Sequence, residues 1–189
     1  MEDRAEHYYK EGFVFFKKGQ YSEALASCDK AIAINRDYAD AWNGRGVALA
    51  ELGLHAEALD SYDKAIAIRP DYADAWNNRG WALVELGRHA DAVDSYDKGL
   101  AINPDDASAW FIRGAELGIL LRHTEALASF DKAIAITQDD AYTWNFRGVA
   151  LHELGRYKEA VASYDKAIAI NPDYSEVKQN RKMALKKLI

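Results

Sequence analysis

Cysteine, proline and long apolar runs are scarce in this chain. Its 189 residues include one cysteine, Cys28, which excludes an intramolecular disulfide and a multi-thiolate metal site. Three prolines and twelve glycines are too few for collagen-like or linker-like sequence. No apolar stretch is long enough to span a membrane, and charges in the first residues, MEDRAEHYYKEG, interrupt the apolar core that a signal peptide needs. We therefore expect a soluble cytoplasmic protein.

Positive charge is also in deficit. The chain has 24 Lys and Arg against 30 Asp and Glu, which gives a formal net charge of −6. An acidic chain does not attract nucleic-acid phosphates or anionic lipid, so neither nucleic acid nor a membrane is expected as a partner. The hydrophobic fraction of 49% is ordinary for a folded globular protein.

The chain does contain a repeat. The segment YDKAIAI occurs at residues 62–68 and again at 164–170. Residues 39–72 and 73–106 are identical at 24 of 34 aligned positions. Tryptophan recurs at the same period of 34 residues, at Trp42, Trp76, Trp110 and Trp144. Such self-similarity is typical of a repeat protein. Five units are predicted, at residues 5–38, 39–72, 73–106, 107–140 and 141–174.

Each unit is expected to form two helices. Apolar residues recur at three- and four-residue intervals in both halves of the unit. The first helix is predicted to end at a glycine and the second at a proline; the glycines are Gly53, Gly87 and Gly155, and the prolines are Pro70, Pro104 and Pro172. A single hairpin cannot bury its apolar faces, so neighbours must stack. We predict an all-α solenoid of about eleven helices, one array over residues 1–189 with a capping helix at 175–188.

The pattern resembles the tetratricopeptide repeat (TPR) family over about 170 of the 189 residues. Repeat 2 supplies the family residues Trp42, Gly46, Leu49, Gly53, His55, Ala58, Tyr62, Ala65 and Pro70. Repeat 1 departs at Cys28 and Arg36, and repeat 4 departs at Leu121 and Gln138. The resemblance implies a right-handed superhelix of antiparallel helix hairpins.

Arginine occupies the seventh repeat position, where the family usually has an aliphatic residue. Each arginine follows an aspartate by 16 residues. The pairs are Asp29 and Arg45, Asp63 and Arg79, Asp97 and Arg113, Asp131 and Arg147, and Asp165 and Arg181. We hypothesise buried ion pairs across the junctions between repeats, because the planar guanidinium fork suits a carboxylate. The alternative is that both charges are solvated.

No residue pattern favours catalysis, a metal or a cofactor. His55, His89 and His123 recur at one repeat position, but two packed helices of about 8–10 Å each separate equivalent side chains, too far apart for one zinc ion. His152, Glu153 and Cys28 lack partners at a convincing spacing. We therefore predict that the protein is not an enzyme and that it binds neither a metal nor a cofactor.

The TPR resemblance implies a concave groove, lined by the first helices, that receives a peptide. None of the family's clamp positions carries Lys or Arg here, so capture of an acidic chain terminus is not expected. The predicted groove residues are Tyr9, Phe13, Asn43, Asn77, Asn78, Trp81, Phe111, Ile112, Tyr142, Asn145 and Phe146. Repeats 3–5 would form an apolar cradle, and the amides would read the backbone of an extended ligand. Alternatively, the aromatic side chains bury one another between repeats.

Two classes of function follow. The first is a protein-protein interaction scaffold that binds a peptide or partner segment in the groove. The second is self-assembly, in which array ends stack head to tail or form a homo-oligomer, through the apolar Leu188 and Ile189 or through the aromatic first helix. A consensus-like or truncated array without a dedicated ligand is the remaining alternative.

Overall fold

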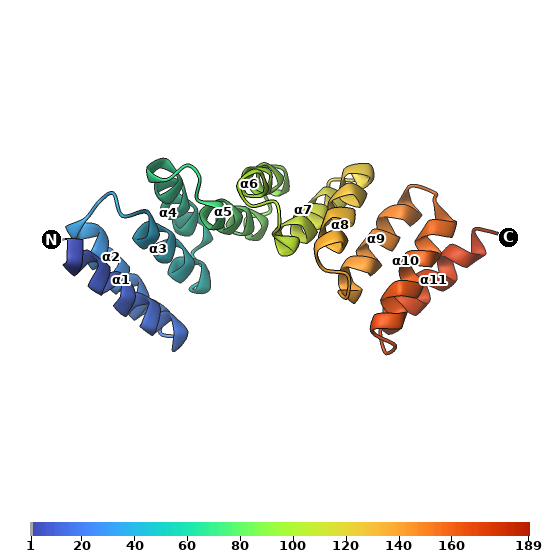
Figure 1. Ribbon diagram of the computed structural model, residues 1–189, viewed down its shortest axis with the longest axis horizontal. Helices are drawn as coiled ribbons and strands as arrows, with labels where there is room; N and C mark the ends of the chain where they lie inside the picture. Colours follow the sequence, from blue (N-terminus) through green and yellow to red (C-terminus); the bar gives the residue numbers. More distant parts are fainter. Residues whose placement is uncertain (1) are drawn as a thin grey trace. The chain divides into compact units, whose positions relative to one another are not determined.

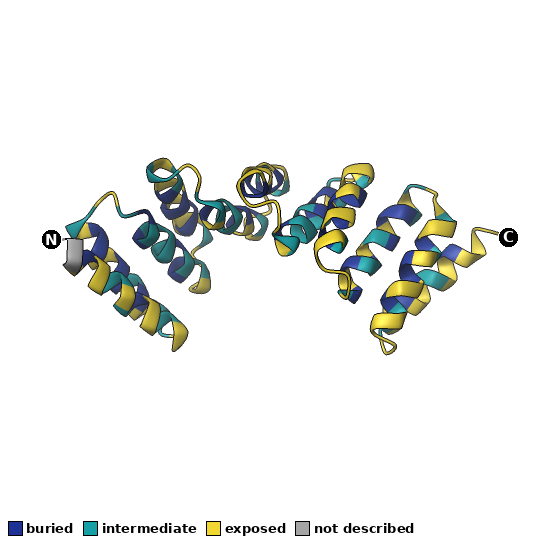
Figure 2. Ribbon diagram, viewed as in Figure 1, coloured by how far each residue is buried: buried dark blue, intermediate teal, exposed yellow. Residues whose placement is uncertain are grey.

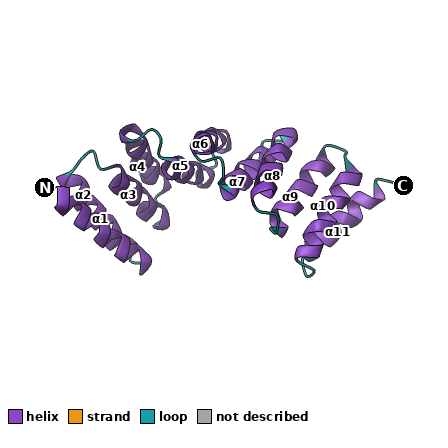
Figure 3. Ribbon diagram, viewed as in Figure 1, coloured by secondary structure: helices purple, strands orange, loops and turns teal. Residues whose placement is uncertain are grey.

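The computed structural model describes residues 2–189 and contains only helices in that range (Figure 1, Figure 3). The eleven helices of the described residues are α1 (Glu2–Lys17), α2 (Tyr21–Ile34), α3 (Ala39–Glu51), α4 (His55–Ile68), α5 (Ala73–Glu85), α6 (His89–Ile102), α7 (Ala107–Ile119), α8 (His123–Ile136), α9 (Ala141–Glu153), α10 (Tyr157–Ile170) and α11 (Ser175–Lys186). The predicted all-α repeat fold is confirmed, because each repeat folds as one helix pair and α11 follows the last.

The chain divides into two compact units, Met1–Ile102 and Asn103–Ile189. The first unit holds the hairpins α1–α2, α3–α4 and α5–α6, and each hairpin packs on the next through α2 with α3 and α4 with α5. The second unit holds α7–α8 and α9–α10, with α11 against α10. A single array over all 189 residues stays a prediction.

The turn inside each hairpin needs one residue in the left-handed region. Four glycines supply it, Gly19, Gly53, Gly87 and Gly155, with φ between 70° and 76°. Repeat 4 has Leu121 at this position and still adopts a φ of 59°. A leucine is strained there because its Cβ crowds the backbone. The repeat geometry therefore overrides the local preference of that residue.

In each helix hairpin after the first, an aromatic ring of the second helix packs directly against a glycine of the first helix. The rings of Tyr62, Tyr96, Phe130 and Tyr164 are each 2% exposed. A Cβ added at Gly46 would lie 2.5 Å from the Tyr62 ring. Glycine is therefore required so that the first helix can approach the ring. In Figure 2 the buried residues, drawn in dark blue, alternate with exposed yellow residues along the helices.

The last helix ends the apolar packing as predicted for a capping helix. Its buried residues are Val177 and Ala184, both fully covered. Most of its other side chains are exposed, and four of them are charged, including Lys178, which stands where repeats 2 to 5 have tryptophan. The helix covers the apolar face of the last repeat and presents charge outward.

Candidate functional site

The first helices of consecutive repeats lie next to one another within each unit. In the first unit α1 contacts α3 and α3 contacts α5, and in the second unit α7 contacts α9 and α9 contacts α11. We call the surface that these helices share the first-helix face of that unit. Every groove residue predicted from the sequence belongs to one of these helices.

A tryptophan fixes the start of α3, α5, α7 and α9. The indole Nε1 of Trp42 donates to the carbonyl of Arg36 at 2.9 Å, and Trp76 donates to the carbonyl of Pro70 at 3.0 Å. The same bond recurs at Trp110 and Trp144. These tryptophans tie the loop between repeats to the helix that follows. They therefore hold the first-helix face in register.

The predicted aspartate–arginine pairs occur at four repeat junctions that lie within the units. The Arg Nε to Asp Oδ1 distances are 2.8 Å for Arg45–Asp29, 2.7 Å for Arg79–Asp63, 2.6 Å for Arg147–Asp131 and 2.5 Å for Arg181–Asp165. The expectation that they are buried is wrong, because the aspartate side chains are 50–53% exposed. Solvent screens such pairs and reduces their contribution. The Asp97–Arg113 pair spans the two units and stays a prediction.

A serine that the sequence reasoning missed is the second partner of the arginine. Arg79 Nη1 donates to Ser95 Oγ at 2.6 Å, and this hydroxyl donates to the Asp91 carbonyl at 2.9 Å. Serine recurs at this repeat position and is at most 2% exposed, as Ser27, Ser61, Ser95, Ser129 and Ser163. Repeat 1 lacks the arginine, and its Ser27 donates to Glu11 instead. The 34-residue recurrence of serine was the signal that could have identified it.

The predicted amide ladder is largely bonded within the protein. In the first unit Asn78 donates to Asn43 at 3.1 Å, and Asn43 donates to the Tyr72 hydroxyl at 3.4 Å. In the second unit Asn180 donates to Asn145 at 3.2 Å. Asn145 is only 2% exposed, so its amide is closed to a ligand in this structure.

Asn77 points toward the second helix of its own repeat. A Cβ added at Gly99 of α6 would lie 2.1 Å from the Asn77 side-chain oxygen. Glycine at this position of α6, where other repeats have alanine, makes room for the Asn77 side chain. The side chain therefore packs between α5 and α6 and is only partly accessible from the first-helix face.

The aromatic residues of the second unit partly pack on one another and partly face solvent. Phe146 lies 5.3 Å from Phe111 and 6.1 Å from Phe130, measured between ring centroids. The Tyr142 ring packs at a tilt against Tyr174, with 5.3 Å between centroids, yet Tyr142 keeps 59% of its surface exposed, and Phe146 keeps 37%. Both predicted alternatives therefore hold in part. Ile112 is half-buried on the same helix as Phe111.

An apolar hollow lies beside these rings. It measures about 230 Å³ and is bounded by α7, α8 and α9. Its lining residues are Gly114, Ala115, Gly118, Ile119, His123, Ala126, Phe130, Phe146, Val149 and Ala150. No charged Asp, Glu, Lys or Arg lines it, so it suits an apolar group.

In the first unit Trp81 borders a polar hollow. The indole is 47% exposed, and the hollow measures about 350 Å³. Glu51, Glu85 and His55 also line it. The two carboxylates favour a basic or neutral ligand over an acidic one. Trp81 and the aromatic residues of repeats 4 and 5 belong to different units, so the cradle over repeats 3–5 stays a prediction.

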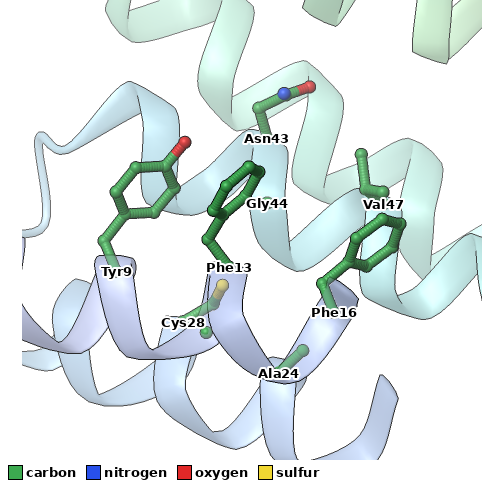
Figure 4. Close-up of a pocket in the computed structure, with 9 residues that line it drawn as sticks. Tyr9, Phe13, Phe16, Ala24, Cys28, Asn43, Gly44 and Val47 are labelled. Atoms are coloured by element: carbon green, nitrogen blue, oxygen red, sulfur yellow. The ribbon is translucent and has the colours of Figure 1, made fainter. Parts of the chain in front are cut away.

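Tyr9 and Phe13, the predicted groove residues of repeat 1, line a third hollow of about 150 Å³ (Figure 4). Phe13 is 53% exposed, whereas Tyr9 is half-buried and its ring packs at a tilt against Tyr38. Cys28 lies in the wall of this hollow, and its burial raises the pKa of the thiol to about 11. The thiol is therefore protonated at neutral pH.

A charged network flanks the same region. Arg69 Nη1 and Nη2 bind the two carboxylate oxygens of Asp40 at 3.1 and 2.9 Å. The hydrogen bond from Arg69 lowers the pKa of Asp40, against the opposing effect of partial burial. Burial and the neighbouring Asp40 raise the pKa of Tyr72. This network ties the end of α4 to the start of α3.

Among residues 2–189 no three His, Cys, Asp or Glu side chains gather as ligands for a metal ion would. None of the described helices combines the length and apolar character needed to cross a membrane.

Solved structures share the fold over most of the chain. YrrB, described as a TPR protein with an unusual peptide-binding site, superposes with a TM-score of 0.83 at 25% identity, covering 93% of this chain and 90% of its own. MamA of Desulfovibrio magneticus RS-1 gives a TM-score of 0.82 at 20% identity, covering 91% and 97%.

A curated relative matches only a short segment. An uncharacterised protein of Methanocaldococcus jannaschii is 44% identical over 46 residues, which is 24% of this chain and 54% of the relative. The match therefore spans about half the length of that protein.

Sequence models described as tetratricopeptide repeat match residues 9–73, and residues 73–106 and 141–174. Together with the helix hairpins and the shared fold, these matches place the chain in the tetratricopeptide repeat family.

Proposed function

We propose that this protein is an interaction scaffold that binds an apolar segment of a partner protein on its first-helix face, chiefly at repeats 4 and 5. The observation that carries the proposal is the apolar hollow of about 230 Å³ between α7, α8 and α9. Ile119, Phe146 and Val149 at this hollow expose between 37% and 57% of their surface. Exposed aromatic and aliphatic side chains around a preformed hollow are suited to anchor a ligand side chain.

Two further observations support this function. The solved relative YrrB is described as peptide-binding, and it shares the fold over most of both chains. The half-exposed rings of Tyr142 and Phe146 are held by Tyr174 and Phe111, so they lose little freedom on binding. We infer no catalytic role and no cofactor, and the expected partner is a protein or peptide.

Filling the hollow tests the proposal. A Cβ added at Gly118 meets no atom within 4 Å, so the backbone there accepts a side chain, and we expect a longer one to extend into the hollow that Gly118 lines. Peptides are first selected from a random library on the intact chain, and their affinities are measured by fluorescence anisotropy. We expect Gly118→Leu to weaken them at least about tenfold, since an apolar side chain buried on binding contributes about 1.5–3 kcal/mol.

Gly118→Ala is the matched control. Like Gly118→Leu, it raises the helix propensity of the position, but it adds only one methyl group to the hollow. It should therefore bind the peptides nearly as well as the natural chain. Equal binding by the natural chain and Gly118→Leu would refute the proposed location. A mass that grows with protein concentration in light scattering, with no peptide selected, would favour self-assembly instead.

A further inference from the structure

The hollow between α3, α4 and α5 differs in chemistry from the hollows at repeats 1 and 2 and at repeats 4 and 5. It measures about 350 Å³ and lies within the first unit. No Asp, Glu, Lys or Arg lines the other two hollows. Here Glu51 of α3 and Glu85 of α5 line the wall, and no lysine or arginine does. A hollow at this place is a property of the repeat, whereas its acidic wall belongs to repeats 2 and 3.

The two carboxylates of this wall have no cationic partner. Both glutamates are exposed, and neither forms an ion pair with a Lys, Arg or His among the described side chains. Other exposed acids of the chain do pair with arginine, as Asp63 does with Arg79. Glu51 accepts a hydrogen bond from the Tyr21 hydroxyl, which leaves its charge in place. The negative charge of the hollow is therefore not neutralised by the protein.

A buried tyrosine hydroxyl without a partner borders the same hollow. Tyr62 of α4 is only 2% exposed, and its ring packs on Gly46. It lines the hollow, and its hydroxyl forms no hydrogen bond with the described residues. Burial, and then the charge of Glu51, raise the pKa of this hydroxyl. Because buried polar groups are normally hydrogen-bonded, this hydroxyl is available to a polar ligand.

Trp81 adds a broad aromatic face to the hollow. Repeats 2, 4 and 5 have only Val47, Ala115 and Val149 at this repeat position, and repeat 1 has Phe13. Trp81 is 47% exposed, so packing within the protein does not account for its size. A tryptophan face attracts cations more strongly than the other aromatic side chains do.

We propose that this hollow binds an arginine side chain of a partner protein. A guanidinium is planar, stacks on an aromatic face and donates five hydrogen bonds but accepts none. Glu51, Glu85 and the Tyr62 hydroxyl supply acceptors, and Trp81 supplies the face. A lysine carries the same charge without the planar fork, so arginine is preferred. The proposal goes beyond the proposed function, because it assigns a cationic group to a separate site in the first unit.

N-acetyl-arginine methylamide is the first probe, because its guanidinium is its only charge. Heteronuclear NMR follows the indole N–H of Trp81 during a titration. The indole N–H of Trp144, which donates to the Gln138 carbonyl in the second unit, serves as reference. We expect saturable shifts at Trp81 and none at Trp144.

Two analogues separate charge from shape. The citrulline analogue has the same shape without the charge and should bind at least about fivefold more weakly, as one ring contact and two exposed ion pairs imply. The lysine analogue should also bind more weakly than the arginine probe. Equal affinities for the arginine and citrulline probes would overturn the assignment, and tighter binding of the lysine analogue would overturn the choice of arginine.

Three variants test the wall of the hollow. Glu85→Gln removes a charge at nearly constant shape, Tyr62→Phe removes the hydroxyl and keeps the ring, and Trp81→Val introduces the residue of repeats 2 and 5. We expect Glu85→Gln and Trp81→Val each to weaken the arginine probe about two- to fivefold. Tyr62→Phe should weaken it as well. Glu85→Gln should leave the citrulline analogue unaffected.

Glu153→Gln is the matched control. It makes the same change of net charge at the same repeat position in the second unit, so it should bind the arginine probe as the natural chain does. Equal losses in Glu85→Gln and Glu153→Gln would show attraction by net charge alone and would overturn the site. Gly118→Leu should not alter binding of this probe, so a failure here leaves the proposed function at repeats 4 and 5 untouched.

Peptides selected on the natural chain test whether the arginine comes from a partner protein. We expect a selected peptide to contain an arginine whose change to citrulline weakens binding about fivefold to thirtyfold. The same change should have little effect against the double variant Glu51→Gln and Glu85→Gln. Binding should also weaken as salt is added, because exposed charges are screened. A hollow that binds the arginine probe while no selected peptide depends on arginine would refute the partner assignment.

Discussion

Replacing Arg79 with methionine should destabilise the first unit more than its exposed ion pair alone suggests. The guanidinium bonds Asp63 at 2.7 Å and Ser95 at 2.6 Å, and it lies 5.9 Å from the Trp76 ring. The Asp63 side chain is 51% exposed, so this pair contributes only about 0.2–1 kcal/mol. Ser95 is fully buried, and a charged hydrogen bond to such a group contributes about 1.5–3 kcal/mol. The ring contact adds about 0.5–1 kcal/mol. We therefore expect Arg79→Met to cost about 2–5 kcal/mol.

Urea unfolding measures this loss, and a second arginine provides the control. Arg88 immediately precedes α6 and pairs with Asp91 in the first turn of that helix, and both side chains are about half exposed. Arg88→Met should therefore cost at most about 0.5 kcal/mol. A double-mutant cycle with Asp63→Asn should give a coupling of about 0.2–1 kcal/mol. Equal losses for the two arginine variants, or a coupling above the total cost of Arg79→Met, would refute the reasoning.

Three further results are expected. Arg69 lowers the pKa of Asp40 in the folded protein, so the ionised carboxylate stabilises the fold above its unfolded pKa of about 4, and this contribution is lost as the pH falls through the folded pKa. Asp40→Asn should therefore flatten the acid side of a curve of stability against pH. An unchanged slope would contradict this prediction. Trp76→Phe removes the indole donor to the Pro70 carbonyl and should lower the free energy of unfolding, measured by thermal unfolding, by about 0.5–1.5 kcal/mol. An unchanged stability would show that this hydrogen bond does not hold the loop. Tyr62→Cys should cost about 3–5 kcal/mol because it removes a buried ring, and a variant as stable as the natural chain would show that the ring is dispensable.

The periodic features of the sequence were sufficient to predict the helices. Glycine and proline at fixed repeat positions end the helices within two residues of the observed bounds, as Gly53 follows α3 and Pro70 follows α4. Leu121 shows why the repeat is a better guide than local preference. Its side chain disfavours a positive φ, yet the packing of α7 on α8 imposes the same turn as glycine does.

The orientation and exposure of individual side chains could not be predicted from the period. Asn77 and Asn145 occupy groove positions, but one packs toward Gly99 and the other is covered. The aspartates of the ion pairs lie at the edge of the junction, so they stay half exposed although their spacing was identified correctly. These outcomes depend on the volumes of neighbouring residues in three dimensions.

The pocket at Cys28 illustrates the same limit from the opposite side. The sequence showed that cysteine replaces an aromatic residue, and it predicted a small packed side chain. Cys28 is indeed 3% exposed. The hollow beside it could not be predicted from the period, because it depends on how α1, α2 and α3 pack against one another.

The central claim is that a partner segment binds the first-helix face. Methyl NMR of the chain with a selected peptide tests it most directly, because Val149 on α9 and Ile170 on α10 are similarly exposed, at 37% and 39%. We predict large shifts at Val149 and none at Ile170. Shifts at Ile170 with Val149 unchanged would place the partner on the second helices and contradict the account.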